Sequence, residues 1–437
     1  MKGKFKKLAA AFAAVTVFVG SMPSMAFAAG SNYTGVSGGT VKFDKVLVVE
    51  SDAKVPPVTF AYTINPGTAV PATDDTKLAV YAGVGSPTIG TAAYSVNDTA
   101  DSPDDTRVFG TASDAYYTVK KDVSVNFGSV TFTEPGIYRY IIEETASNAA
   151  YGISDDVGPA GTFTAKNVEL KRTLDVYVED NGSGELRVTD YVLYEGTVTE
   201  QPTPAASTHH AAYTSGYVNV ATVADGGDGA NLGPKSNSYI NLYKTHNLTI
   251  AKNVTGNQGS KDKYFAFTVV FTNAVNGTVY DVDITNADDS PAANAATTHA
   301  SMSNPTSITI SGETTATFYL QNGQRVVIKG IADGTQYSVE EDEEDYSPAL
   351  LVTGDTDGTA TNDGTTVTLT SGSGAADKYA DTGITDNTSL TFTNTRSGVL
   401  PTGIIMSVAP AAIVGLGVLA AIIAMIVAGK RRAAEEE

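Results

Sequence analysis

Short stretches in which apolar and polar residues alternate recur along most of the chain, and turn-forming residues separate them. Successive side chains of a β-strand point to opposite faces, so this alternation indicates strands with one face in a core. Many short strands with frequent turns are typical of β-sandwiches, and no long helical pattern is evident between the two ends of the chain. The pattern predicts strands at residues 58–64, 130–132, 137–142, 174–178, 186–194, 264–271, 316–320, 325–328, 337–339, 365–370 and 389–393.

Turn residues predict how some of these strands are joined. The sequence Asn-Gly-Ser-Gly at residues 181–184 predicts a hairpin between the strands on either side of it. Asn322-Gly323 predicts a second hairpin in the same way. Residues 199–238 are rich in Pro, Ala and Gly and lack periodicity, which predicts a long loop.

The two halves of the chain share an ordered pattern. Each half opens with apolar-x-apolar-x-Lys, continues with Tyr-x-apolar-x-Glu, and ends with aromatic-x-Asn. The motifs end at Lys45, Glu144 and Asn241 in the first half and at Lys252, Glu341 and Asn394 in the second. Two copies of one ordered triad indicate two copies of one domain. We therefore predict two tandem β-sandwich domains, at residues 41–246 and 247–397.

Strand parity predicts that all six of these polar side chains point inward. Residues two apart in a strand share a face, so Lys45 lies on the face of Phe43, whereas Lys42 is solvated. Glu144 is predicted to point inward and its neighbour Glu143 outward by the same rule. The equivalent residues of the second half also fall on apolar faces.

A lysine and a glutamate buried together can share one proton, because burial lowers the pKa of the amine and raises that of the acid. The neutral amine is a nucleophile, and the protonated acid can polarise an asparagine carbonyl and move protons. Lysine Nζ would then attack asparagine Cγ, ammonia would leave, and an isopeptide bond would remain. The predicted bonds are Lys45–Asn241 and Lys252–Asn394, with Glu144 and Glu341 as the catalytic acids. The alternative is a set of exposed strand charges, or buried salt bridges beside unrelated asparagines.

The chain contains no cysteine, so disulfides cannot stabilise it outside the cell. The two predicted bonds would close loops of 196 and 142 residues. By the chain-entropy argument used for disulfides, each is worth about 5 kcal/mol. The isopeptide bonds would therefore take the place of disulfides.

The N-terminus carries an export signal. Four lysines, an apolar stretch and an Ala-Phe-Ala sequence predict a signal peptide at residues 1–28, followed by an extension at residues 29–40. Export and sorting would remove seven basic and three acidic residues, so the net charge of −20 for the whole chain becomes about −24. An acidic surface argues against nucleic acid or anionic lipid as a partner.

The C-terminus, residues 398–437, is typical of a sortase sorting signal. Leu400-Pro401-Thr402-Gly403 precedes an apolar run of membrane-spanning length and a basic Lys-Arg-Arg sequence. A sortase would cut after the threonine and join its carbonyl to an amine. Only this C-terminal segment would contact the membrane, and only before the sortase cuts the chain. The alternative is a plain membrane anchor.

No motif predicts a cofactor, a metal site or an enzyme with turnover. The sequence Asp-Thr-Asp-Gly at residues 355–358 resembles the start of a calcium loop but lacks the later glutamate, so we predict a turn. His209 and His210 have no cysteine or acidic cluster beside them. No nucleophile elbow, P-loop or dinucleotide fingerprint is present in the sequence.

Four stretches carry a family resemblance: residues 131–140, 318–323, 334–341, and 390–394 running into 400–410. Through them the chain resembles the two-domain FctA (T-antigen-type) backbone pilins of Gram-positive bacteria. The resemblance implies immunoglobulin-like domains of the Cna protein B type, with internal Lys–Asn isopeptide bonds at the residues named above. Two departures are a shorter sorting motif and a longer loop before Asn241.

The resemblance also implies a surface lysine that serves as nucleophile for polymerisation, a few residues before the first domain's final asparagine. The nearest candidate is Lys235, in a Gly/Pro loop that would expose it. Lys244 and Lys166 are the fallbacks, and an ordinary solvated lysine is the alternative.

We therefore expect the structural major subunit of a sortase-assembled pilus, secreted, displayed on the Gram-positive cell wall and supporting surface attachment. Its partners would be a sortase, neighbouring subunits in a covalent homopolymer, and peptidoglycan or minor pilins. The alternative is a monomeric wall-anchored adhesin or minor pilin, which would bind a host ligand through residues 199–238.

Overall fold

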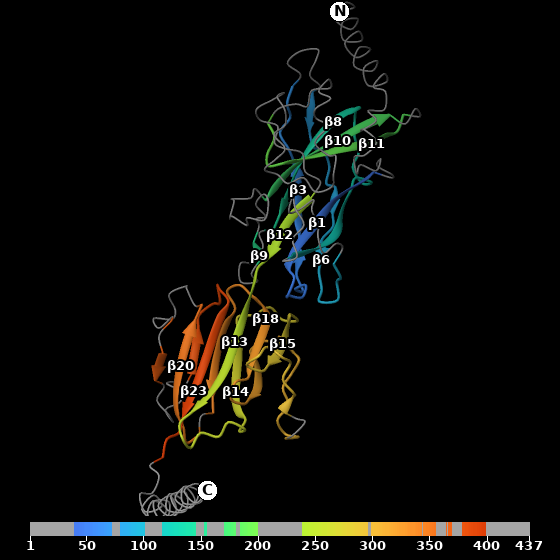
Figure 1. The fold of residues 1–437 in the computed structure, drawn as a ribbon. Coiled ribbons are helices and arrows are strands. Elements are labelled where there is room, and N and C mark those ends of the chain that lie inside the picture. The colour runs from blue at the N-terminus through green and yellow to red at the C-terminus, as the bar shows by residue number, and fades with distance from the viewer. Residues whose placement is uncertain are drawn as a thin grey trace, which may run out of the picture.

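The computed structural model describes residues 39–71, 79–100, 116–145, 153–154, 170–180, 184–199, 238–295, 299–342, 344–354, 364, 366–368 and 378–398. These residues form strands and turns without an α-helix, so the predicted all-β class is confirmed for them (Figure 1). No helix among them is long and apolar enough to cross a membrane. The predicted signal peptide and sorting signal lie outside these residues and stay predictions.

The part of the chain from β1 to β12 is called the N-terminal unit below. Its two main sheets have the strand orders β5-β7-β1-β12-β9 and β11-β10-β8-β3, β4 also pairs with β8, and β2 and β6 form a small sheet. The strands are β1 (Thr40–Glu50), β2 (Thr59–Phe60), β3 (Tyr62–Pro66), β4 (Val80–Ala82), β5 (Thr88–Ile89), β6 (Ala92–Ala93), β7 (Tyr116–Asn126), β8 (Gly136–Glu144), β9 (Ile153–Ser154), β10 (Lys171–Asp180), β11 (Leu186–Glu195) and β12 (Ser238–Tyr243).

The part from β13 to β23 is called the C-terminal unit. Its sheets have the strand orders β16-β15-β18-β13-β23-β20-β21 and β17-β14-β19-β22. The strands are β13 (Thr245–Thr255), β14 (Phe265–Thr272), β15 (Val279–Thr285), β16 (Ser307–Thr309), β17 (Thr314–Leu320), β18 (Arg325–Ala332), β19 (Gln336–Glu341), β20 (Ser347–Thr353), β21 (Thr366–Thr368), β22 (Lys378–Asp381) and β23 (Thr388–Thr395). The division into domains with the boundaries given above stays a prediction.

Each unit has a hydrophobic core built mainly from the inward faces of its strands, and the core of the N-terminal unit also includes Ala332 at the end of β18. Strand β14 shows how alternation produces such a face. Phe265, Phe267, Val269 and Phe271 are at most 1 % exposed, while the residues between them are only partly buried. Because apolar burial is the main favourable contribution to folding, this face determines which side of the strand points inward.

In both units the first strand pairs in parallel with the last strand. β1 lies beside β12, with Lys45 opposite Tyr239. β13 lies beside β23 in the same way, with Lys252 opposite Phe392. Parallel neighbours cannot be joined by a short turn, so all the other strands of each unit lie between them in the sequence.

One of the two predicted hairpins is confirmed and the other is wrong. β10 and β11 are antiparallel neighbours, as the Asn-Gly-Ser-Gly sequence predicts. Gly323 does adopt a positive φ of 80° in a turn, but β17 and β18 on either side of it belong to different sheets. A tight turn reverses the direction of the chain but does not decide whether the two strands pair. Here the inward faces of β17 and β18 are both buried in the core, so the two strands lie in sheets on opposite sides of it.

The alternation pattern also misplaced some strands. Residues 130–132 form no strand, and residues 58–64 are divided between β2 and β3. β7, β15 and β20 were not predicted. β7 pairs with β1, and its outer face is partly solvated. It therefore carries several polar residues near its middle, which hide the alternating pattern.

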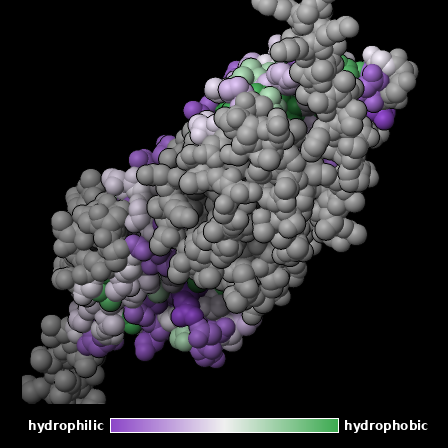
Figure 2. Space-filling view, turned by 90° about the horizontal axis from the view of Figure 1, so that it is seen from above, coloured by the Kyte–Doolittle hydropathy of each residue, from purple (hydrophilic) through white to green (hydrophobic). Residues whose placement is uncertain are grey.

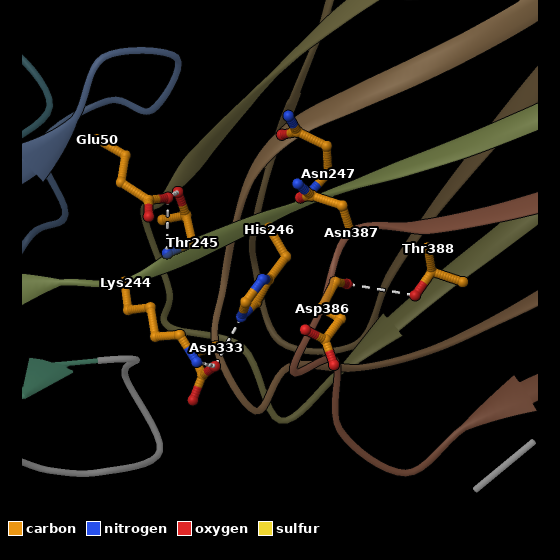
Figure 3. Close-up of polar contacts among 9 residues, drawn as sticks. All are labelled: Glu50, Lys244, Thr245, His246, Asn247, Asp333, Asp386, Asn387 and Thr388. Atoms are coloured by element: carbon orange, nitrogen blue, oxygen red, sulfur yellow. Dashed lines mark hydrogen bonds and ion pairs between the residues drawn. The ribbon is translucent and has the colours of Figure 1, made fainter. Parts of the chain in front are cut away.

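The two units meet where β12 and β13 follow each other, with only Lys244 between them (Figure 3). The carboxylate of Glu50, at the end of β1, accepts hydrogen bonds from the amide and the hydroxyl of Thr245. Asp333 accepts from Lys244 at 2.8 Å and lies 2.6 Å from His246 Nε2. Polar contacts therefore connect both units to the strand that joins them.

The view in Figure 2 shows the described surface as mostly purple and pale, with green in small separate patches. Large apolar side chains are gathered in the cores instead, where Phe and Tyr rings contact one another. The described residues that are visible in this view therefore show no extended apolar patch of the kind that marks a protein interface.

Candidate functional site

The N-terminal unit brings Lys45, Glu144 and Asn241 together in its core. Their exposed fractions are 0 %, 2 % and 1 %. Lys45 Nζ lies 2.6 Å from Glu144 Oε2 and also contacts Asn241 Oδ1. The amine therefore touches the acid and the amide at the same time.

The strands explain this placement. Lys45 and Asn241 lie on the neighbouring parallel strands β1 and β12, whereas Glu144 ends β8 in the facing sheet. Asn241 stands opposite Leu47, two residues beyond the register partner of Lys45, so the lysine and the asparagine share the inward face. The site thus spans the core from one sheet to the other.

The C-terminal unit repeats the arrangement with Lys252, Glu341 and Asn394, which are 0 %, 3 % and 0 % exposed. Lys252 and Asn394 lie on the parallel pair β13 and β23, and Glu341 ends β19 in the facing sheet. Asn394 again stands two residues beyond the register partner of the lysine. The two sites therefore share their strand positions as well as their residue types.

The contacts within the second triad differ in detail. Lys252 Nζ lies 2.5 Å from Glu341 Oε1, and Asn394 Nδ2 donates a hydrogen bond to the same oxygen at 3.0 Å. The glutamate therefore contacts both the amine and the amide. A carboxyl group in this place can pass a proton between them, which is the role expected of a general acid–base.

Aromatic rings surround both amines. Lys45 Nζ lies 3.9 Å from the ring centroid of Phe60, and Lys252 Nζ lies 4.3 Å from that of Phe265. Burial raises the pKa of Tyr62 well above its ordinary value, and the nearby Glu144 raises it further, so this phenol stays neutral. A charged amine in such surroundings is stabilised by the acid beside it and by ring faces.

Outward neighbours behave as parity predicts. Lys42 and Glu340 are exposed, whereas the residues that belong to the triads are buried. Glu143 is only partly buried, and its carboxylate lies 3.9 Å from the amine of Lys171 at the surface. These residues provide controls that carry the same charge without reaching the core.

Of the other predicted site residues, only Lys244 lies in the part of the chain that the structure describes. Lys235, Lys166 and the sorting residues Leu400-Pro401-Thr402-Gly403 lie outside the described residues, as do His209, His210 and residues 355–358. Lys244, a fallback nucleophile, lies at the junction with 46 % of its side chain exposed and pairs with Asp333. No group of three or more His, Asp and Glu side chains in the described ranges could hold a metal ion.

The sequence interpretation missed two side chains beside the first triad. Arg172 is 3 % exposed, and its guanidinium carbon lies 4.6 Å from the ring centroid of Tyr239. Parity could have found Arg172, because it precedes the inward residues Leu174 and Val176 of β10 by two and four positions. Tyr239 was noted only as the aromatic residue of the motif that ends at Asn241.

Two parts of the chain match two different protein families. Residues 41–214 match the FctA family, described as a Spy0128-like isopeptide containing domain. Residues 246–396 match a domain of unknown function, DUF7601. No curated protein matches the chain by sequence.

Comparison with solved structures supports the fold. The major pilin from Streptococcus pyogenes is 19 % identical, with a TM-score of 0.50, and the match covers 83 % of this chain and 100 % of that one. A second major pilin from the same organism, T3.2, is 17 % identical with a TM-score of 0.46, covering 82 % of this chain and 99 % of that one. The first match agrees with the all-β architecture, and the second is too distant to add to it.

Proposed function

Residues 41–214 contain a domain of the FctA isopeptide family, which confirms the resemblance to FctA-type pilins, and on that premise we propose that this protein is the major subunit of a covalent pilus. The chain would be exported and sorted at the surface of a Gram-positive cell. Its role would be structural, with each subunit forming one link of a fibre that supports attachment.

We propose further that each unit is stabilised by one internal isopeptide bond. The observation that carries this proposal is the pair of buried Lys–Glu–Asn triads at equivalent strand positions. In each, Nζ would attack Cγ of the asparagine, and the glutamate would move a proton from the amine to the departing amide nitrogen. Ammonia leaves, so one C–N bond forms and another breaks, and no cofactor is needed.

Two tandem immunoglobulin-like domains at residues 41–246 and 247–397 would contain these bonds. Each triad lies within one of the predicted domains, and each unit has its own core. The bonds join the first strand of a unit to its last strand, so tension along the chain would pass through the bond rather than through the other strands. This arrangement suits a fibre subject to shear.

Assembly would use the two ends of the molecule. A sortase would cut after Thr402 and transfer its carbonyl to a lysine of the next subunit, for which Lys235 is the candidate. Lys235 precedes Ser238, the first residue of β12, by three positions. The final subunit would be joined to peptidoglycan or to minor pilins.

Intact mass of the full-length protein tests the internal bonds. We expect the wild type to lack two ammonia molecules relative to its sequence, and Glu144→Ala and Glu341→Ala each to lack one fewer. Glu143→Ala and Glu340→Ala are matched controls, because they remove outward carboxylates next to the catalytic ones. A wild-type mass with one loss or none would contradict the two-bond proposal.

Boiled wall extracts of the native host test assembly. A blot with antibody to residues 41–397 is expected to show a high-mass ladder that collapses in Lys235→Ala and persists in Lys166→Ala. A ladder that persists in Lys235→Ala would support a covalent pilus but would mean that another lysine is the nucleophile. One band in all strains would contradict polymerisation and favour the wall-anchored adhesin.

A further inference from the structure

The ring of Tyr239 lies next to the first triad. Tyr239 is the register partner of Lys45, precedes Asn241 by two positions, and is 3 % exposed. Its ring centroid lies 5.3 Å from those of Phe43 and Tyr62, and 5.9 Å from Lys45 Nζ. It therefore forms part of the wall around the amine.

The hydroxyl of Tyr239 reaches the facing sheet. It donates a hydrogen bond to the main-chain carbonyl of Ile142 at 3.1 Å. Ile142 lies on β8 in the facing sheet, two positions before Glu144. This hydrogen bond connects the strand that carries the asparagine to the strand that carries the acid.

A buried cation covers the same ring. Arg172 on β10 stands in register opposite Ile142, and its guanidinium carbon lies 4.6 Å from the ring centroid of Tyr239. Burial raises the pKa of Tyr239 well above its ordinary value, although the charge of Arg172 acts in the other direction. The phenol therefore keeps its proton at every physiological pH and remains a donor.

The C-terminal unit has no hydroxyl at the equivalent place. The register partner of Lys252 is Phe392, whose ring packs edge-on against Phe267 at 5.3 Å. Phe267 stands in register opposite Glu341. Ring packing thus connects the two sheets at this centre, whereas a hydrogen bond connects them at the other.

We infer that Tyr239 is a positioning residue for the N-terminal bond, holding the strand of Asn241 against the strand of Glu144 through its hydrogen bond to Ile142. The inference rests on the proposed isopeptide reaction. Attack requires the reacting atoms to be held at near-contact distance, and displacement by about 1 Å costs up to about a hundredfold in rate. Without the hydroxyl, the aromatic ring still fills its site but the two strands are no longer connected beside the reacting groups.

The test compares Tyr239→Phe with Tyr243→Phe in the full-length chain. Tyr243 lies on the same strand and the same face, is 1 % exposed, and its hydroxyl has no hydrogen-bond partner among the described residues. Samples are taken as the newly made chain folds, and the Lys45–Asn241 and Lys252–Asn394 linked peptides are quantified by mass spectrometry. We expect Tyr239→Phe to slow the first linkage about tenfold to a hundredfold. Tyr243→Phe should leave both rates unchanged.

The rates are measured on the protease-resistant fraction, so that a folding defect lowers the yield without changing the rate. The Lys252–Asn394 linkage is a second control, because it would form in the same molecule with Phe392 at the position that Tyr239 occupies in the first unit. An unchanged Lys45–Asn241 rate in Tyr239→Phe, or equal slowing of both linkages, would overturn the inference. A wild-type protein without the Lys45–Asn241 linkage would overturn the proposed reaction itself, which is a separate result.

Discussion

The two units place the same three residue types at the same strand positions but surround them with different side chains. In the N-terminal unit, Lys45 contacts both Glu144 and Asn241. In the C-terminal unit, Glu341 contacts both the lysine and the asparagine. The parallel register is shared, whereas the packing around it is not. Strand register therefore brings the groups together, and local packing determines how they touch.

A second difference lies outside the two triads. The N-terminal unit buries an ion pair on the outer side of a sheet, between Arg139 and Asp175, which are both fully buried. Arg139 also donates to the carbonyl of Val198, in the segment that follows β11. In the C-terminal unit, the lysine and the glutamate of the triad form an ion pair in which both side chains are at most 2 % exposed. The N-terminal unit thus buries an ion pair outside its triad as well as within it.

The largest expected effect comes from preventing one proposed isopeptide bond at a time. Asn241→Ala and Asn394→Ala would each prevent the proposed bond but leave the buried Lys–Glu pair in place. We expect the free energy of unfolding of the affected unit to fall by about 5 kcal/mol in each case. The different loop lengths alter this by less than about 0.5 kcal/mol. Urea unfolding followed by circular dichroism measures both.

Asn253→Ala is the control for this pair, because Asn253 is exposed on β13. Its free energy of unfolding should match that of the wild type. A loss of less than about 1 kcal/mol in both triad variants would mean that no covalent loop is present, because uncharged polar contacts alone account for a loss of that size.

The second prediction concerns the buried ion pair of the N-terminal unit. Asp175→Ala leaves the guanidinium of Arg139 buried without its carboxylate, which typically destabilises by about 3–5 kcal/mol. We expect only the transition of the N-terminal unit to move in thermal unfolding. Glu179→Ala, on the same strand near its end, should change stability by less than about 0.5 kcal/mol. Equal shifts of both units would contradict the assignment of this pair to one unit.

The smallest effect is expected at the junction, where Asp333→Asn tests the contacts of this carboxylate with Lys244 and His246. Burial alone would raise the pKa of Asp333, but hydrogen bonds from His246 and Lys244 lower it below the ordinary value of 3.8. A lowered pKa means that the ionised group stabilises the fold above its ordinary pKa, and that this contribution is lost as the pH falls below it. The carboxylate is 30 % exposed, so we expect it to contribute less than about 1 kcal/mol to the free energy of unfolding.

The measurement is the free energy of unfolding of wild type and Asp333→Asn from pH 7 down to pH 2. The two curves should differ at neutral pH and converge below pH 4. Asp342→Asn, at an exposed position after β19, should follow the wild type throughout. A gap that widens as the pH falls would show that the sign of this interaction is opposite to the one inferred.

Much of the fold and most of the candidate site could be predicted from local pattern. Alternation predicted β14 and β23 well, because each has one face in a core and a less buried face opposite it. It also predicted β8 and β10, although the outer face of these two strands buries the ion pair of Arg139 and Asp175. It missed β7 and misjoined β17 and β18, because the choice of sheet depends on which inward faces meet across a core and not on the turn residues. The sequence did not indicate a buried Arg172, since charged residues are usually solvated, and in the structure its guanidinium packs against the ring of Tyr239.

Alternation along each strand indicated which side chains point inward, because successive residues face opposite sides wherever the strand lies. Lys45, Glu144 and Asn241 could therefore be assigned to a core, and their repeated order predicted the pair of Lys45 and Asn241. The tertiary structure added how these two residues meet across 196 residues of sequence, through a parallel pairing of the first and last strands. The tertiary structure also shows that a tyrosine hydroxyl connects the two sheets beside one triad, whereas an aromatic pair connects them beside the other. Such pairings depend on how distant faces bury one another, and no local pattern contains that information.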